Sequence, residues 1–145
     1  MKKLFLLLIL IFSTNAMAGN ELNLYDVNGN AVAYIALNDE LTVYSWSGEP
    51  DAYLKRGRNN AFDVYGFNGK HLGWFIKGML FDHDGYAVCA LKESVVTSHL
   101  PSLKSLKKLK PLKSLPELPP LTPLLKDTFG HTDCSLLLSS GISKN

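Results

Sequence analysis

The sequence has little of several features that identify familiar classes of protein. It has only two cysteines, and its formal net charge is only +2. No apolar stretch reaches the ~20 residues of a membrane span. No nucleophile elbow, phosphate-binding glycine loop or dinucleotide fingerprint occurs in it. We therefore expect a protein that is not an enzyme and that carries no cofactor.

The first 18 residues have the three zones of a secretory signal. Lys2 and Lys3 precede an apolar run over residues 4–12, and a polar stretch then ends in "AMA". This pattern predicts cleavage near Ala18 and an exported protein, periplasmic or secreted. A retained, uncleaved anchor is the alternative.

Without that signal the chain is neutral, because 13 basic residues then face 13 acidic ones. The neutrality hides an asymmetry. Residues 19–99 hold six basic and ten acidic groups, whereas residues 100–125 hold five lysines and one glutamate. The first part lacks the basic face that phosphate binding requires, so nucleic acid is not an expected partner. The basic segment leaves anionic surfaces open as partners.

One pattern recurs four times, as "LYDVNGNAVAYI", "VYSWSGEPDAYL", "VYGFNGKHLGWF" and "LFDHDGYAVCAL". Each copy has a glycine preceded by Asn, Ser or Asp, and these glycines are Gly29, Gly48, Gly69 and Gly85. Asn-Gly and Asp-Gly between β-rich runs predict two-residue type I′ turns with positive φ at both central residues. The repetition predicts four β-hairpins.

The alternation of side chains gives each hairpin an aromatic face and an aliphatic face. The aromatic face collects Tyr25, Tyr34, Tyr44, Tyr53, Tyr65, Trp74 and Phe81, with Val32, Asp51, Leu72 and Val88 opposite the residues that precede the turns. The predicted core face collects Leu24, Val43, Val64, Leu80, the small Ala33, Ala52, Gly73, Cys89, and then Ile35, Leu54, Phe75 and Leu91. Because a lone hairpin is marginal in water, we expect an all-β ring of four hairpins around a pseudo-four-fold axis.

At this point the sequence resembles the four-fold β-flower family. The "YGFNGKHLGWF" and "FDHDG" stretches carry the resemblance, which extends over residues 22 to about 92. It implies four hairpins around a pseudo-four-fold axis and supplies no catalytic residues. The sequence departs from the pattern at Ser47, in the second turn, and at Ala90, which ends the aromatic column.

The "FDHDG" stretch has two interpretations. Asp82, His83 and Asp84 suit metal ligation or acid–base chemistry, but they equally suit a turn in which Asp84 accepts positive φ and Asp82 caps amides. If adjacent hairpins bring His71 near His83, two histidines and an aspartate would suit a divalent metal. Neighbours in sequence, as in "GHTDCS", rarely reach the geometry of a catalytic triad.

The aromatic residues also have two interpretations. Stacking surfaces for sugar rings would make the protein a glycan or cell-wall-binding module, whereas buried packing between hairpins is the structural alternative. The candidate contact residues are Tyr34, Trp46, Tyr53, Phe67, His71, Trp74 and His83.

From Leu100 to Leu124 a leucine occupies every third position, and prolines rule out a long helix. Polyproline II, with three residues per turn, places these leucines on one edge. A second edge, also a candidate contact, holds Lys104, Lys107, Lys110 and Lys113. A straight segment would span roughly 75–80 Å, too long for its own domain. It is therefore a disordered linker or docks on a partner groove, a neighbouring subunit or a membrane.

The two cysteines, Cys89 and Cys134, form either a disulfide or separate thiols. We divide the chain into a signal (1–18), a four-hairpin domain (19–99), an extended segment (100–126) and a C-terminal segment (127–145). In the last of these, "SLLLSSGI" suits either a short strand or a part of the same interaction element as the leucines. The expected function is non-catalytic binding or scaffolding in the cell envelope, with an unknown protein, glycan or membrane as partner. The alternatives are a glycan-binding module and a metal-dependent enzyme. The oligomeric state stays open.

Overall fold

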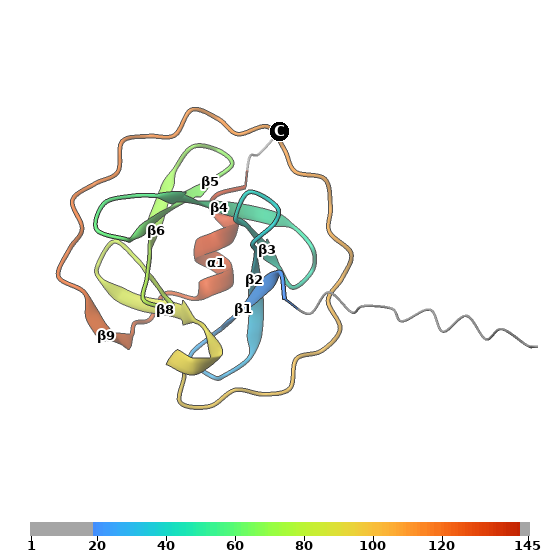
Figure 1. Ribbon diagram of the computed structural model, residues 1–145. Helices are drawn as coiled ribbons and strands as arrows, with labels where there is room; N and C mark the ends of the chain where they lie inside the picture. The colour runs from blue at the N-terminus through green and yellow to red at the C-terminus, as the bar shows by residue number, and fades with distance from the viewer. Residues whose placement is uncertain (1–18, 143–145) are drawn as a thin grey trace, which may run out of the picture.

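The computed structural model describes residues 19–142, so the expected signal of residues 1–18 lies outside the described residues. Eight antiparallel strands follow one another in sequence order, and pairing of the first with the eighth closes them into a barrel (Figure 1). The strands are β1 (Glu21–Tyr25), β2 (Ala31–Ala36), β3 (Thr42–Ser45), β4 (Pro50–Arg56), β5 (Phe62–Gly66), β6 (His71–Ile76), β7 (Met79–Phe81) and β8 (Tyr86–Ala90). The predicted all-β ring of four hairpins is confirmed.

The core fills the inside of the barrel. The aliphatic and small residues of the predicted core face gather there, and Leu24, Val43, Val64 and Ala52 are fully buried. At Gly73 the small size is needed because the backbone of the neighbouring strand β7 lies close by. A Cβ added to Gly73 would lie 2.0 Å from the Phe81 carbonyl oxygen.

The hairpin turns differ from the predicted type I′ turns. In the first, the Gly29 amide donates to the Asp26 carbonyl and the Asp26 amide to the Asn30 carbonyl. Each of the four turns has positive φ at its glycine, between 78° and 87°, but not at the residue before it. This is a three-residue loop, in which a type I turn is followed by a glycine bulge. The expected positive φ of Asp84 is therefore wrong.

A second irregularity follows each turn and shifts the predicted register. Tyr25 pairs with Ala31, not with Val32, while Leu24 pairs with Ala33, so Val32 is an extra, bulged residue. The other three hairpins repeat the shift. The bulge turns its extra residue inward, and Leu72 and Val88 consequently lie in the core, not on the aromatic face. Asp51 occupies the same position in the second hairpin.

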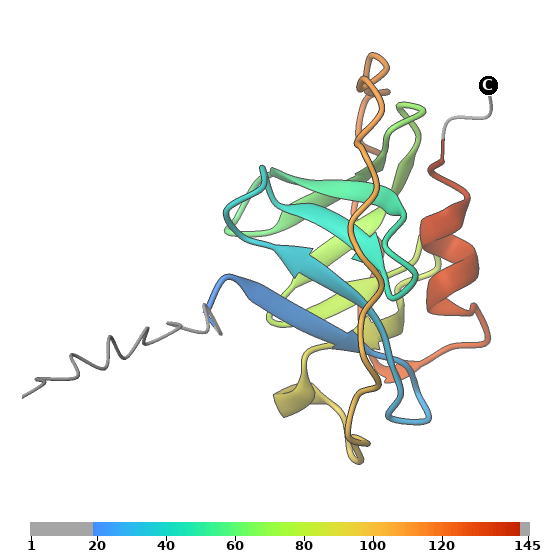
Figure 2. The same cartoon turned by 90° about the vertical axis from the view of Figure 1, so that its right-hand side faces the viewer.

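The C-terminal segment closes one end of the barrel. A short 3₁₀ turn, η1 (Lys92–Ser94), follows β8; later β9 (Lys126–Phe129) pairs in parallel with β8, and the helix α1 (Cys134–Ser139) covers the barrel end (Figure 2). The "SLLLSSGI" run is thus largely helical, not a strand. In the described part of the chain, no helix is both long and apolar enough to cross a membrane.

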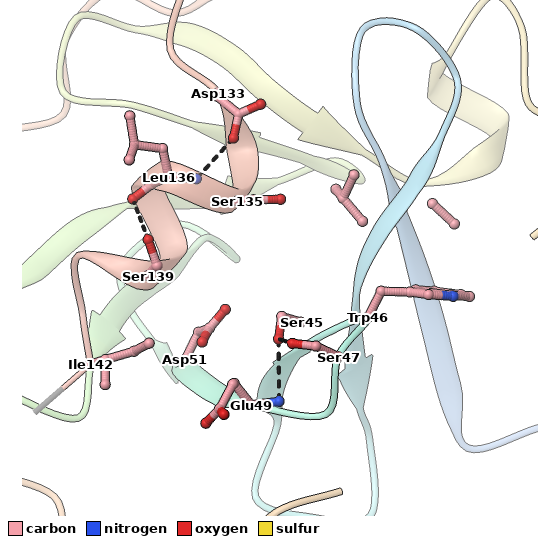
Figure 3. A pocket seen from close by; sticks show the side chains of 12 residues that line it. Ser45, Trp46, Ser47, Glu49, Asp51, Asp133, Ser135, Leu136, Ser139 and Ile142 are labelled. Carbon is pink, nitrogen blue, oxygen red and sulfur yellow. Dashed lines mark hydrogen bonds between the residues drawn. The ribbon is translucent and has the colours of Figure 1, made fainter. Parts of the chain in front are cut away.

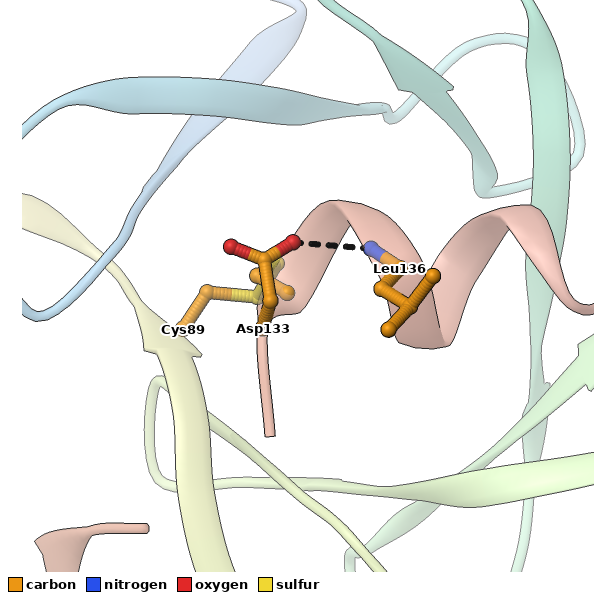
Figure 4. The surroundings of a disulfide bond; sticks show 4 residues. Cys89, Asp133 and Leu136 are labelled. Carbon is orange, nitrogen blue, oxygen red and sulfur yellow. Dashed lines mark hydrogen bonds between the residues drawn. A yellow bond between two sulfur atoms is a disulfide. The ribbon is translucent and has the colours of Figure 1, made fainter. Parts of the chain in front are cut away.

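A disulfide joins Cys89 of β8 to Cys134, the first residue of α1 (Figure 4). The two Cα atoms are 5.6 Å apart, within the range that disulfides require. Asp133 accepts a hydrogen bond from the Leu136 amide at 2.9 Å and caps the helix beside the bridge. Covalent bonding and capping together fix α1 over the core, where Leu138 is fully buried.

Residues 97–126, here called the belt, run around the outside of the barrel (Figures 1 and 2). The belt amides of His99, Lys108, Glu117 and Lys126 donate to the carbonyls of Gly29, Gly48, Gly69 and Gly85 at 2.8–2.9 Å. The donors are nine residues apart, so three leucine periods of three residues each separate one anchored hairpin from the next. The expectation that the segment cannot lie on its own domain is wrong, because it assumed a straight segment.

The turn glycines have a second role beneath the belt. A Cβ added to Gly69 would lie 2.4 Å from the Leu115 carbonyl oxygen, and the other three turn glycines face belt carbonyls at 2.0–2.3 Å. Only a residue without a side chain lets the belt approach closely enough for the backbone hydrogen bond. The glycines therefore serve both the turn and the closure of the belt.

We predict that Gly69→Ala loosens the belt, and Gly78→Ala is the matched control. Both glycines have positive φ, and a Cβ on Gly78 first meets the Ser94 hydroxyl at 3.3 Å. In both variants an alanine in the left-handed conformation lowers the free energy of unfolding by ~1–2 kcal/mol. Only Gly69→Ala is also expected to expose the belt lysines to trypsin. Equal cleavage rates at Lys113 in the two variants would contradict this role of Gly69.

We also predict that replacing both cysteines by alanine lowers the free energy of unfolding by about 4 kcal/mol, from the loop-entropy relation. The bridge closes a 45-residue separation that includes the whole belt. Urea unfolding with and without reductant measures the effect. The variant should match the reduced wild-type chain, and an unchanged midpoint on reduction would count against this contribution.

Candidate functional site

The outer edge of the belt carries nine leucines, here called the leucine ring. Their side chains point to solvent although they are apolar, with exposed fractions between 85% and 96%. The members are Leu100, Leu103, Leu106, Leu109, Leu112, Leu115, Leu118, Leu121 and Leu124. The belt anchors divide them into three arcs of three, at residues 100–106, 109–115 and 118–124. The ring is the most extensive exposed apolar feature of the described chain.

The lysine edge of the belt points inward. Lys104 and Lys107 bind the two carboxylate oxygens of Glu21 at 2.6 and 2.9 Å, and Lys110 binds Asp39 at 2.6 Å. Lys113 pairs with Glu40 at 2.8 Å. Sequence analysis expected these lysines to face a partner, but the structure places them against the acidic groups of the barrel.

The pKa values of the acids agree with this pairing. Burial raises the pKa of Glu21. Hydrogen bonds from Lys104 and Lys107, together with their charges, lower this pKa by more than burial raises it, so the net shift is downward. Hydrogen bonds from Lys110 and then Tyr44 lower the pKa of Asp39. The charges of −4 on residues 19–99 and +4 on residues 100–125 thus neutralise each other within one molecule.

The aromatic side chains lie between the barrel wall and the belt. Tyr34, Tyr53 and Trp74 are 1%, 6% and 3% exposed, and Phe67 is buried as well. The Lys104 ammonium lies 4.2 Å from the Tyr34 ring centre. Lys104 thus covers the Tyr34 ring and Lys113 the Tyr53 ring, and the four buried rings present no open platform to a sugar.

Two further contacts attach the belt to aromatic side chains. The half-buried Trp46 indole donates to the Ser102 carbonyl at 3.2 Å. The Tyr65 hydroxyl donates to the Glu117 carbonyl at 2.9 Å. Where aromatic side chains contact the belt, they fix its path.

Hairpin packing does bring His71 close to His83. The buried His71 Nε2 lies 3.0 Å from an Asp63 oxygen, and its Nδ1 lies 2.9 Å from Nε2 of the exposed His83. Because the Asp63 carboxylate accepts a hydrogen bond, neutral His71 carries its hydrogen on Nε2, and its Nδ1 accepts a hydrogen bond from His83. The arrangement is a short proton-sharing chain that ends at the surface.

The hydrogen-bonded group of Asp63, His71 and His83 contains two histidines but no complete ligand set for a metal. Among residues 19–142, no group of three His, Cys, Asp or Glu side chains is placed to hold a metal ion. Glu117 accepts from the backbone amide of His71 at 2.7 Å. Asp82 accepts from the Asp84 and Tyr86 amides, both at 3.0 Å, which is turn chemistry.

Comparison with known proteins identifies the family. The model of the family described as "4-fold beta flower protein" matches residues 22–138, which covers the hairpins, the belt and most of α1. The chain belongs to the 4-fold beta flower family. Neither a curated protein nor a solved structure matches it.

Two features of this beta flower protein escaped sequence analysis. The first is the spacing of nine residues between successive belt anchors. The leucine pattern of the sequence contained a signal for it, since nine residues are three leucine periods. The second is Asp51, which sequence analysis placed on the aromatic face. It is 2% exposed and lies beneath α1, and the bulge that turns it inward leaves no trace in hydrophobic alternation.

We predict that His71 of this beta flower protein has a pKa below the ordinary 6.5. Burial lowers its pKa below the ordinary 6.5, although Asp63 raises it. As the pH falls through 6.5, His71 becomes protonated in the unfolded chain but not yet in the folded protein. This residue therefore lowers the free energy of unfolding as the pH falls. Ring NMR titration measures the pKa, and Asp63→Asn should lower it further. A pKa of His71 above 6.5 would contradict the assignment.

Proposed function

We propose that this beta flower protein is a non-catalytic binding or scaffolding protein of the cell envelope that docks partner proteins on its leucine ring. The observation that carries the proposal is the exposure of nine leucines on a belt whose other contacts are satisfied. Apolar surface of this extent normally marks an interaction site. The backbone anchors hold the leucines in place before any partner arrives, so little ordering entropy opposes binding.

The partner's chemistry follows from the shape and charge of the ring. The belt is convex along its whole course around the barrel (Figure 1), so a concave apolar groove fits it better than a flat bilayer or a second convex copy. The lysines are already paired with barrel acids, which removes the main attraction to an anionic membrane. Each buried leucine would contribute about 1.5–3 kcal/mol before binding costs.

The three arcs support a scaffolding role. Each arc has three leucines and begins and ends at a turn glycine. The three arcs therefore present the same leucine pattern in three directions. Up to three partner proteins with similar apolar grooves could bind the ring at the same time. The expected signal of residues 1–18 and the disulfide both suit an oxidising compartment outside the cytoplasm.

Photo-crosslinking in intact cells tests the proposal. A photoreactive residue replaces Leu112, at the centre of the middle arc, and Leu136 on α1 is the matched control because it is exposed but off the belt. We expect protein adducts of defined mass at position 112, and also at 103 and 121, but not at 136. Replacing Leu109 and Leu115 by serine should reduce the yield at position 112 at least fivefold.

Other outcomes would overturn the docking proposal. Adducts at position 112 no stronger than at 136 would remove the leucine ring as a contact surface. Adducts of exactly twice the chain mass would assign the ring to self-association, and lipid adducts alone would assign it to a membrane. The purified chain in sedimentation and vesicle-binding assays distinguishes these two cases.

A further inference from the structure

An open pocket of about 610 Å³ lies between α1 and the hairpin of β3 and β4 (Figure 3). Polar groups from both elements line it, and apolar side chains including Val32, Trp46 and Ile142 complete it. The polar lining residues are Ser45, Ser47, Glu49, Asp51, Asp133, Ser135 and Ser139. It is distinct from the leucine ring, which lies on the outer edge of the belt.

Asp51 is the unusual residue in this pocket. Its side chain is buried, with 2% of the residue exposed, and among residues 19–142 its Oδ1 has no hydrogen-bond partner. Figure 3 shows its carboxyl group between α1 and the turn of the β3–β4 hairpin. An unpaired buried carboxyl group destabilises a fold.

The four-fold repetition shows that the fold does not need an acid there. The equivalent bulged residues are Val32, Leu72 and Val88, which all pack in or against the core. An apolar residue therefore satisfies the same backbone position in three hairpins of the same chain. The carboxyl group at the fourth has a cost without a structural return, which indicates a ligand.

The charge of the pocket indicates the kind of ligand. Glu49, Asp51 and Asp133 contribute carboxyl groups, and no lysine, arginine or histidine is among the lining residues. Glu49 is paired on its outer side with Lys108, and Asp133 is engaged in capping α1. Of these three carboxyl groups only that of Asp51 has a buried oxygen without a hydrogen-bond partner, so it is the one that gains most from a bound cation.

We propose that this pocket binds an organic cation, a primary ammonium or guanidinium group on a short apolar stem, through the carboxyl group of Asp51. The described residues contain no three-ligand arrangement for a metal, whereas an ammonium needs only one carboxylate and hydroxyl acceptors. Ser45 and Ser139 supply hydroxyl oxygens in the same pocket, and Val32 and Ile142 offer an apolar surface for the stem.

Binding to Asp51 depends on pH with a definite sign. Burial, and then the charge of Glu49, raise the pKa of Asp51 to about 7. Below that pH the carboxyl group is neutral and attracts a cation weakly. A bound cation favours the ionised form, so binding releases a proton and tightens as the pH rises through 7. Glu49 and Asp133 are the other titratable groups lining the pocket.

Calorimetry and NMR of the disulfide-bonded chain with n-butylammonium test the proposal. We expect saturable binding at pH 8, at least tenfold weaker binding at pH 5, and a shift of the Asp51 carboxyl ¹³C signal on binding. Asp51→Asn should weaken binding at least tenfold. Asp127→Asn, which removes an exposed carboxyl group of β9 that does not line the pocket, is the matched control and should change the affinity less than threefold.

Two further measurements keep the test decisive. The neutral 1-butanol should not bind at the concentration that saturates with n-butylammonium. Asp51→Val, which copies Val32 and Val88, should abolish binding and raise the melting temperature, which separates loss of the site from loss of the fold. Equal binding by Asp51→Asn, equal binding of 1-butanol, or no saturable binding at pH 8 would each overturn the proposal.

Discussion

The contact on which the architecture depends is the one between a turn glycine and a belt carbonyl. At four places the bare Cα of a glycine lies under the belt, and the glycine carbonyl accepts a belt amide. The glycines come from four successive hairpins. The belt therefore binds all four hairpins with a single spacing of nine residues. The lysine pairs and the covered aromatic rings follow from this register, because the nine-residue step brings each belt lysine to an acid or a ring of the barrel.

The sequence was sufficient for the hairpins and for the core. Glycine spacing located the turns, and alternation identified the inward column of Leu24, Val43, Val64 and Leu80, because both signals are local. It was not sufficient for the bulges. An Asn-Gly pair suits a type I′ turn and also a type I turn with a glycine bulge, and the two place the next residues on opposite faces. Asp51 was misplaced because it is the extra residue of a bulge that follows its turn.

The belt shows a different limit of sequence reasoning. The period of three correctly predicted a leucine edge, since all nine leucines are exposed, but the prediction assumed a straight segment, whereas the belt bends around the barrel. The direction of the lysines was misjudged for the same reason, since a straight segment offers them no acids. Likewise, the approach of His71 to His83 depended on which hairpins are neighbours in space, and the chain order alone left that open.

The late position of the belt in the chain has a consequence for biosynthesis. The belt lysines that cover Tyr34 and Tyr53 are translated after the barrel that carries these rings. A polypeptide that stops short of residue 100 would still have its inner core residues, yet the outer sides of these two rings would lack their cover. Unfinished or clipped copies would therefore be adhesive, and a quality-control factor that recognises exposed rings would find them readily.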